Sequence, residues 1–141
     1  LERQFADAKG KDLYLFMHHP PFEIGIPALD RISLVQKEAF SEVVTPYRDQ
    51  IRHLFFGHIH RPLSGSWLGI PISSLRGMNH QLQLDMTDRS LQGNFEPPAY
   101  CVVLFRDDTL IVHTHDFMDS SPKFDMACSP VQDWAVMKPC S

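Results

Sequence analysis

The first half of the chain is organised around two short apolar segments. Leu13–Met17 (LYLFM) has no alternation of apolar and polar residues, and it lies between Gly10-Lys11-Asp12 and Pro20-Pro21. Such a run is typical of a strand that is buried on both faces, so we predict a central strand of a sheet here. Ile51–Phe56 (IRHLFF) is predicted to be a second buried strand.

Between these segments, apolar residues recur at helical spacing. They are Ile32, Val35, Ala39, Phe40, Val43 and Val44. Ser33 and Gln36 could form a capping box, and Asp30 could also cap the helix. The helix should end near Thr45, because Pro46 disfavours helical geometry in the residue before it. The order strand, helix, strand predicts an α/β fold with a parallel pair and a right-handed crossover.

The second half has the pattern of β-hairpins. Residues 66–68 and 70–75 around Gly69 predict a tight hairpin, and Tyr100–Phe105 with Leu110–His115 predict another. Residues 82–98 are polar and lack a period, which is typical of a long loop, such as a lid or a substrate loop. We predict a domain over residues 1–118 and a tail over residues 119–141, which is rich in Ser, Pro and Asp.

Composition narrows the function classes. The chain has 141 residues, of which 43% are hydrophobic and 21% charged, as in an ordinary globular domain. A net charge of -4 argues against a nucleic-acid or membrane-binding face, and no apolar run approaches the ~20 residues of a membrane span. Three cysteines form no CxxC pair, which favours a reducing, cytoplasmic setting, although a bridge between Cys128 and Cys140 stays open.

Eight histidines are the one compositional excess, and several of them follow the predicted strands. His18 and His19 come directly after the first strand, in HHPP, where two prolines fix the departing backbone. A neutral imidazole there is a good metal ligand, but a buried histidine bonded to a backbone carbonyl is the simpler alternative.

FGHIH follows the second strand. Gly57 lets the chain turn sharply, and alternate positions of an extended segment would place His58 and His60 on the same side. The two histidines could share one ion or each take one of two neighbouring ions, and a solvent-facing pair is the alternative. Both motifs lie at the carboxyl ends of strands, where open α/β sheets bind their ligands.

HHPP, a helix, GHIH, a hairpin and then GMNHQ (residues 77–81) occur in that order. This arrangement resembles the second half of the calcineurin-like metallophosphoesterases, and within them most closely the class III cyclic nucleotide phosphodiesterases and the related glycerophosphodiesterases. The resemblance extends to about Phe117. It implies the second half of a layered β-sandwich flanked by helices.

The resemblance also implies roles for individual residues. His18 and His58 resemble ligands of one metal ion, and His60 resembles a ligand of the other. His80 is similar to a histidine that donates a hydrogen bond to the substrate phosphate, and His19 is expected to pack beside the site. The implied cofactors are two divalent or trivalent ions, with Fe, Mn, Zn or Co suited to imidazole ligands.

The motifs that the family carries in its N-terminal half do not occur in this sequence. The sequence contains no DxH, no GD and no GNH motif, and Gly93-Asn94-Phe95 follows GHIH where the family has its asparagine motif before HHPP. Because the chain also begins at Leu1, we expect an incomplete portion that lacks the bridging aspartate. Its sheet edges and apolar face should then associate with the missing half or with a second copy.

The implied function is metal-dependent hydrolysis of a small phosphodiester, either a cyclic nucleotide or a glycerophosphodiester, with this chain inactive by itself. A non-catalytic scaffold is the alternative, and an unrelated α/β domain is a third. His113 and His115 fit one face of a hairpin strand, so we assign them no metal role. Arg61 could reach an anionic ligand or pair with an acidic neighbour.

Overall fold

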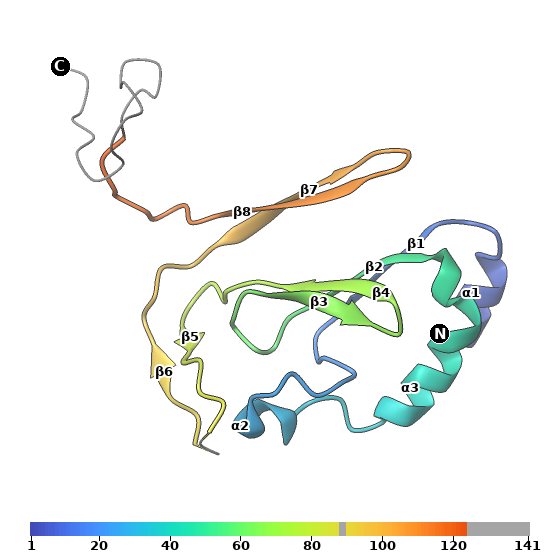
Figure 1. Ribbon diagram of the computed structural model, residues 1–141, viewed down its shortest axis with the longest axis horizontal. Helices are drawn as coiled ribbons and strands as arrows, with labels where there is room; N and C mark the ends of the chain where they lie inside the picture. The colour runs from blue at the N-terminus through green and yellow to red at the C-terminus, as the bar shows by residue number, and fades with distance from the viewer. Residues whose placement is uncertain (88–89, 124–141) are drawn as a thin grey trace.

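A mixed sheet of four strands is the centre of the computed structural model, which describes residues 1–87 and 90–123 (Figure 1). The strand order is β1-β2-β4-β3. The strands are β1 (Leu13–Met17), β2 (Ile51–Phe56), β3 (Leu63–Trp67) and β4 (Ile70–Ser74). β1, β2 and β4 are parallel, and β3 is antiparallel to β4. The α/β class and the parallel pair are therefore confirmed.

The helices lie around the crossover between β1 and β2. They are α1 (Glu2–Asp7), α2 (Pro27–Asp30), α3 (Lys37–Val44) and the 3-10 helix η1 (Thr45–Gln50). α3 ends at Val44, next to the predicted Thr45, but the predicted reason was wrong, because Thr45 itself is helical (φ -52°, ψ -42°) and the chain continues through Pro46 as η1. α2 was not expected, because its four residues are too few to show a helical period.

The predicted start of the crossover helix is wrong. α3 begins at Lys37, and Val35, which was assigned to its apolar face, is 92% exposed. The predicted capping box is absent as well, because the Ser33 hydroxyl donates to the carbonyl of Asp30 and Gln36 makes no side-chain capping bond.

Asp30 bonds to the backbone that precedes α2. Its carboxylate accepts hydrogen bonds from the backbone N–H groups of Ile24, at 2.7 Å, and Gly25, at 3.1 Å. Asp30 thus stabilises the loop that enters α2 and does not cap α3, contrary to the expectation.

The sheet has one core face and one open face. Residues on the core face pack with side chains from α2 and α3, and they include Leu15, Met17, Leu54, Phe56, Ile70 and Ile72. Tyr14, Phe16, His53, Phe55 and Ser73 share the opposite face through the strand register. Tyr14 contacts Phe105 of the hairpin formed by β7 (Tyr100–Phe105) and β8 (Leu110–His115) edge to face, with ring centroids 4.7 Å apart.

β1 is an edge strand and not the central strand that its apolar sequence predicted. Its residues are mostly half-buried, and Phe16 is 70% exposed. The physical reason is that, within the described residues, β2 covers one edge of β1 and nothing pairs with the other.

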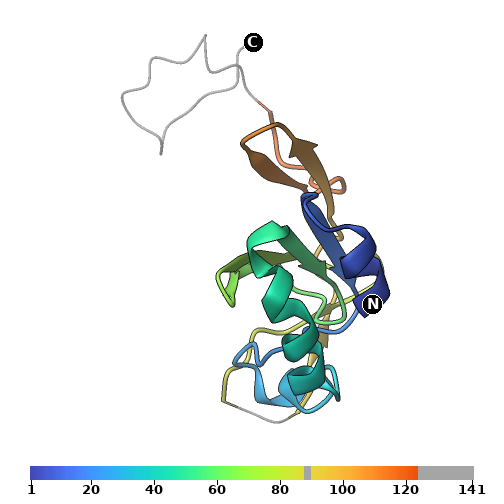
Figure 2. The same ribbon diagram turned by 90° about the vertical axis from the view of Figure 1, so that its right-hand side faces the viewer.

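The predicted hairpins are confirmed. Leu68 and Gly69, both with positive φ, connect β3 to β4, and β7 (Tyr100–Phe105) pairs with β8 (Leu110–His115). Between the hairpins, β5 (Gln81–Leu82) and β6 (Gly93–Asn94) form a short separate pair, which begins one residue before the predicted loop of residues 82–98 and otherwise lies within it. The β7–β8 hairpin lies on the side of the sheet away from α3 (Figures 1 and 2).

The predicted tail begins with residues 119–123, which form no helix or strand. Its remainder lies outside the described residues, and so does the postulated Cys128–Cys140 bridge. Among the described residues, no helix is long and apolar enough to cross a membrane.

Candidate metal centre

The three sequence motifs follow the carboxyl ends of the three parallel strands. His18 follows β1 directly, GHIH begins at Gly57 after β2, and GMNHQ begins at Gly77, three residues after β4. Because β2 lies between β1 and β4, these segments share one rim of the sheet. The sequence predicted this for the first two motifs only. The third joins them because β4 pairs with β2 in parallel.

His18, His19 and His58 form a compact group at this rim. One nitrogen from each imidazole lies within 4.8 Å of the others. The ring centroids of His19 and His58 are 4.2 Å apart, and those of His18 and His58 are 5.2 Å apart. His19, which was expected only to pack beside the site, therefore offers a third nitrogen to it.

His58 is held in an unusual backbone conformation. Its φ is 68°, and the N–H of Ile59 donates to the carbonyl of Gly57 across 2.7 Å, so His58 is the central residue of a γ-turn with positive φ. Such turns are strained and are common at functional sites. The sharp turn thus occurs at His58 and not at Gly57, where the sequence placed it.

The His58 ring has an unpartnered donor atom for a metal. Its Nε2 is buried and makes no hydrogen bond. Burial lowers the pKa of His58 below its ordinary value, and the neighbouring His19 and His18 lower it further, while a backbone hydrogen bond to Ile32 acts in the opposite direction. The lowered pKa favours the neutral imidazole, which is the form that binds metals.

His60 points elsewhere. Segment 58–60 is not extended, because His58 and His60 both have positive φ, and Ile59 between them is fully buried. The argument from alternation was therefore wrong. The His60 ring lies beside His80, with centroids 4.6 Å apart and 2.9 Å between His60 Nδ1 and the His80 carbonyl oxygen. The candidate ligands fall into two neighbouring groups, one around His58 and one around His60.

Arg61 has partners inside the protein. It donates a hydrogen bond to the carbonyl of Leu82 at 2.7 Å and lies 3.7 Å from the Glu96 carboxylate. This is the pairing with an acidic neighbour that was considered for it. His113 and His115 are exposed on β8 and belong to no metal-ligand group among the described residues.

The donor set fits a borderline metal ion. Ions such as Zn²⁺ take imidazole nitrogens at about 2.0–2.1 Å, and the nitrogens of His18, His19 and His58, which lie within 4.8 Å of one another, are a group that could hold one ion. The buried, unbonded Nε2 of His58 costs free energy unless a partner binds it. No carboxylate joins this group within residues 1–87 and 90–123.

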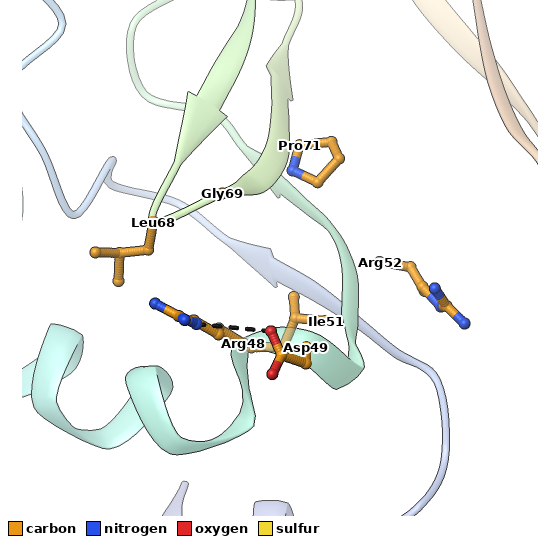
Figure 3. A pocket seen from close by; sticks show the side chains of 7 residues that line it. All are labelled: Arg48, Asp49, Ile51, Arg52, Leu68, Gly69 and Pro71. Atoms are coloured by element: carbon orange, nitrogen blue, oxygen red, sulfur yellow. Dashed lines mark ion pairs between the residues drawn. The ribbon is translucent and has the colours of Figure 1, made fainter.

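A separate hollow lies at the opposite end of the sheet, where β2 begins and the β3–β4 turn passes (Figure 3). Its arginines are paired with carboxylates: Arg48 with Asp49 at 3.6 Å and Arg52 with Asp12 at 2.8 Å. It contains no histidine, so we assign the chemistry to the histidine rim.

Sequence comparison finds relatives among phosphodiesterases. A probable cyclic nucleotide phosphodiesterase of Rhodopseudomonas palustris is 39% identical over 128 residues, covering 89% of this chain and 46% of that protein. A probable glycerophosphodiester phosphodiesterase of Arcobacter nitrofigilis is 33% identical over 101 residues, covering 70% and 37%. The 3',5'-cyclic adenosine monophosphate phosphodiesterase of Escherichia coli is 28% identical over 127 residues, covering 90% and 46%. No family model matches the chain.

The chain is homologous to the calcineurin-like phosphodiesterases. This confirms the resemblance that the motifs indicated. The chain spans less than half the length of each of these three relatives.

Proposed function

We propose that this chain supplies the imidazole side of a dinuclear metal site that hydrolyses a small phosphodiester. The observation that carries the proposal is the buried, unpartnered Nε2 of His58 beside the nitrogens of His18 and His19. His18 and His58 would bind one ion and His60 the other. The relatives, which are phosphodiesterases, support the reaction class.

Bound metal ions would supply Lewis-acid activation of water and of the phosphoryl oxygens. The residues of this chain would hold the ions and orient the diester. His80 lies beside His60 and is half-buried, which supports a role in which its imidazole would donate a hydrogen bond to a phosphoryl oxygen. Fe, Mn, Zn and Co all suit imidazole ligands.

We propose that the other ligands, including a bridging aspartate, come from a preceding segment that the relatives' greater length accommodates. That segment would add the first half of the layered β-sandwich. Two features of the sheet support this: the unpaired edge of β1 within the described residues, and the open face where Phe16 stacks on Phe55 with centroids 4.9 Å apart. In the absence of that segment, the same surface would associate with a second copy of the chain.

Hydrolysis of bis(4-nitrophenyl) phosphate and of cyclic AMP in the presence of Mn²⁺ tests the proposal. The assay should compare the chain with the longest naturally occurring polypeptide that contains it. We expect activity from the longer polypeptide and little from the chain alone. His58→Ala should abolish the activity of the longer polypeptide. His113→Ala, a change on an exposed strand, should leave that activity unchanged. Equal rates in both variants would overturn the proposed site, and metal binding without hydrolysis would indicate a scaffold.

A further inference from the structure

Gln81 is fully buried, and its side-chain amide closes the loop that carries His80 by bonding to Gly77. The Gly77 N–H donates to Gln81 Oε1 at 2.7 Å, and Gln81 Nε2 donates to the Gly77 carbonyl at 2.8 Å. This pair of bonds closes residues 77–81 into a ring. A buried amide satisfied by a single backbone residue holds that residue in place, because breaking either bond leaves a buried polar group unpaired.

The His60 ring lies directly against the backbone of Gly77. A Cβ on residue 77 would stand 2.7 Å from His60 Nδ1 and 2.8 Å from the His80 carbonyl oxygen, which is closer than such atoms approach. Only glycine leaves room there for the ring. The loop therefore forms one wall of the His60 site.

The same loop supplies the hydrogen-bond partner of His60. The distance from His60 Nδ1 to the His80 carbonyl oxygen is 2.9 Å. A carbonyl oxygen only accepts hydrogen bonds, so Nδ1 must carry the proton. In the neutral ring Nε2 is then unprotonated, with its lone pair available for a metal ion.

The backbone of His60 would not keep this orientation unaided. Its φ of 49° is in the left-handed region, which residues other than glycine rarely adopt. Surrounding contacts must hold such a residue, and the ring of residues 77–81 provides them.

We propose that Gln81 is a positioning residue of the metal centre. It fixes the Gly77–His80 backbone, which holds His60 in the Nδ1–H tautomer with Nε2 free for metal. Gln81 itself touches neither metal nor substrate. The inference rests on the proposed function in so far as it takes His60 as a metal ligand, but the tautomer of His60 is independent of any metal.

Imidazole ¹⁵N spectra of the metal-free full chain test the tautomer first, with His60 assigned by the signal missing in His60→Asn. We expect a protonated Nδ1 and an unprotonated Nε2 at a pH where the ring is neutral. An Nε2–H tautomer in the wild-type protein would overturn the proposal without the use of any variant.

The second arm compares Gln81→Leu with Gln83→Leu, a matched change at an exposed glutamine two residues away. Gln81→Leu should lose the uniform Nδ1–H tautomer and bind Mn²⁺ about 10- to 100-fold more weakly, as outer-shell changes typically do. Gln83→Leu should change neither. If Gln81→Leu does not fold, Gln81→Glu, which retains the acceptor for the Gly77 N–H, takes its place and should show a smaller loss.

A Gln81→Leu protein that matches wild type in tautomer and in Mn²⁺ affinity would overturn the positioning role. Failure of the longest naturally occurring polypeptide that contains the chain to bind Mn²⁺ would instead overturn the proposed metal site. The tautomer result would still decide whether Gln81 positions His60, so the two failures are distinguishable.

Discussion

The backbone N–H of Gly57 donates a hydrogen bond to the carbonyl of His18 across 3.0 Å. This bond continues the parallel pairing of β1 and β2 by one step beyond Met17 and Phe56, the last pair of the ladder. His18 and His58 are therefore fixed relative to each other by the backbone, without any need for a bound ion.

Two glycines at the rim should respond differently to alanine. In Gly77→Ala the new Cβ would meet His60 and the His80 carbonyl at under 3.0 Å, whereas in Gly57→Ala it would lie 3.5 Å from His18, an ordinary contact. We expect Gly77→Ala to lower the free energy of unfolding by about 1–3 kcal/mol, as overpacking does, and Gly57→Ala to cost less. Urea denaturation measures both. Equal losses would contradict the close approach at Gly77.

His19 should control the titration of His58. After burial, His19 is the strongest cause of the lowered pKa of His58, and His60 is the weakest. Removing a neighbouring positive charge favours protonation, so His19→Asn should raise the pKa of His58. NMR titration of the metal-free chain measures the change, with His60→Asn as the control. A shift in His60→Asn as large as that in His19→Asn would show that His19 does not belong to the group.

Stability should decrease in mild acid because of His53. Burial lowers the pKa of His53 below 6.5, and its Nε2 lies 2.8 Å from Ser73 Oγ. Between the lowered pKa and 6.5 the unfolded state binds more protons, so the free energy of unfolding falls as the pH drops below 6.5 and levels off below the folded-state pKa.

His53→Gln removes this titration, so stability should depend less on pH in the variant. Urea denaturation from about pH 8 to about pH 5 checks it. His113→Gln, on an exposed strand, is the matched control. Parallel curves for the wild-type protein and His53→Gln would contradict the role of His53.

The open sheet face should mediate association. Phe16 is 70% exposed beside the edge of β1 that no strand of the described residues pairs with, and Phe95, outside the sheet, is 91% exposed. Phe16→Lys should weaken self-association because it places a charge on the apolar face. Phe95→Lys should not weaken it. Size-exclusion chromatography across a range of concentrations measures the effect. A stable wild-type monomer at all concentrations would contradict the expected association.

The sequence predicted the elements whose cause is local. Apolar runs and turn residues located β1, β2 and both main hairpins, and α3 ends at Val44 as expected, although Pro46 continues the chain in a 3-10 helix. The start of α3 was missed because the apolar spacing included Ile32 and Val35, which precede the helix and are exposed. The edge position of β1 was missed because an apolar run does not show which strands are present to pair with it.

For the candidate site, the sequence predicted which histidines lie at the rim of the sheet. It did not predict that they form two groups, one around His58 and one around His60. The positive φ of His58 and His60 sends their rings to different neighbours, and periodicity assumes an extended chain there. Gln81 was not singled out, because a buried glutamine looks like any polar residue until its bonds to Gly77 are seen. Its position in GMNHQ, next to His80, was the only available signal.

Metal content tests the central claim most directly. The chain is equilibrated with Zn²⁺, freed of excess ion, and analysed by mass spectrometry of the metal, together with His58→Ala and His113→Ala. We predict that the wild-type chain and His113→Ala retain bound zinc and that His58→Ala loses it. Retention of the wild-type amount of zinc by His58→Ala would contradict a metal centre at this rim.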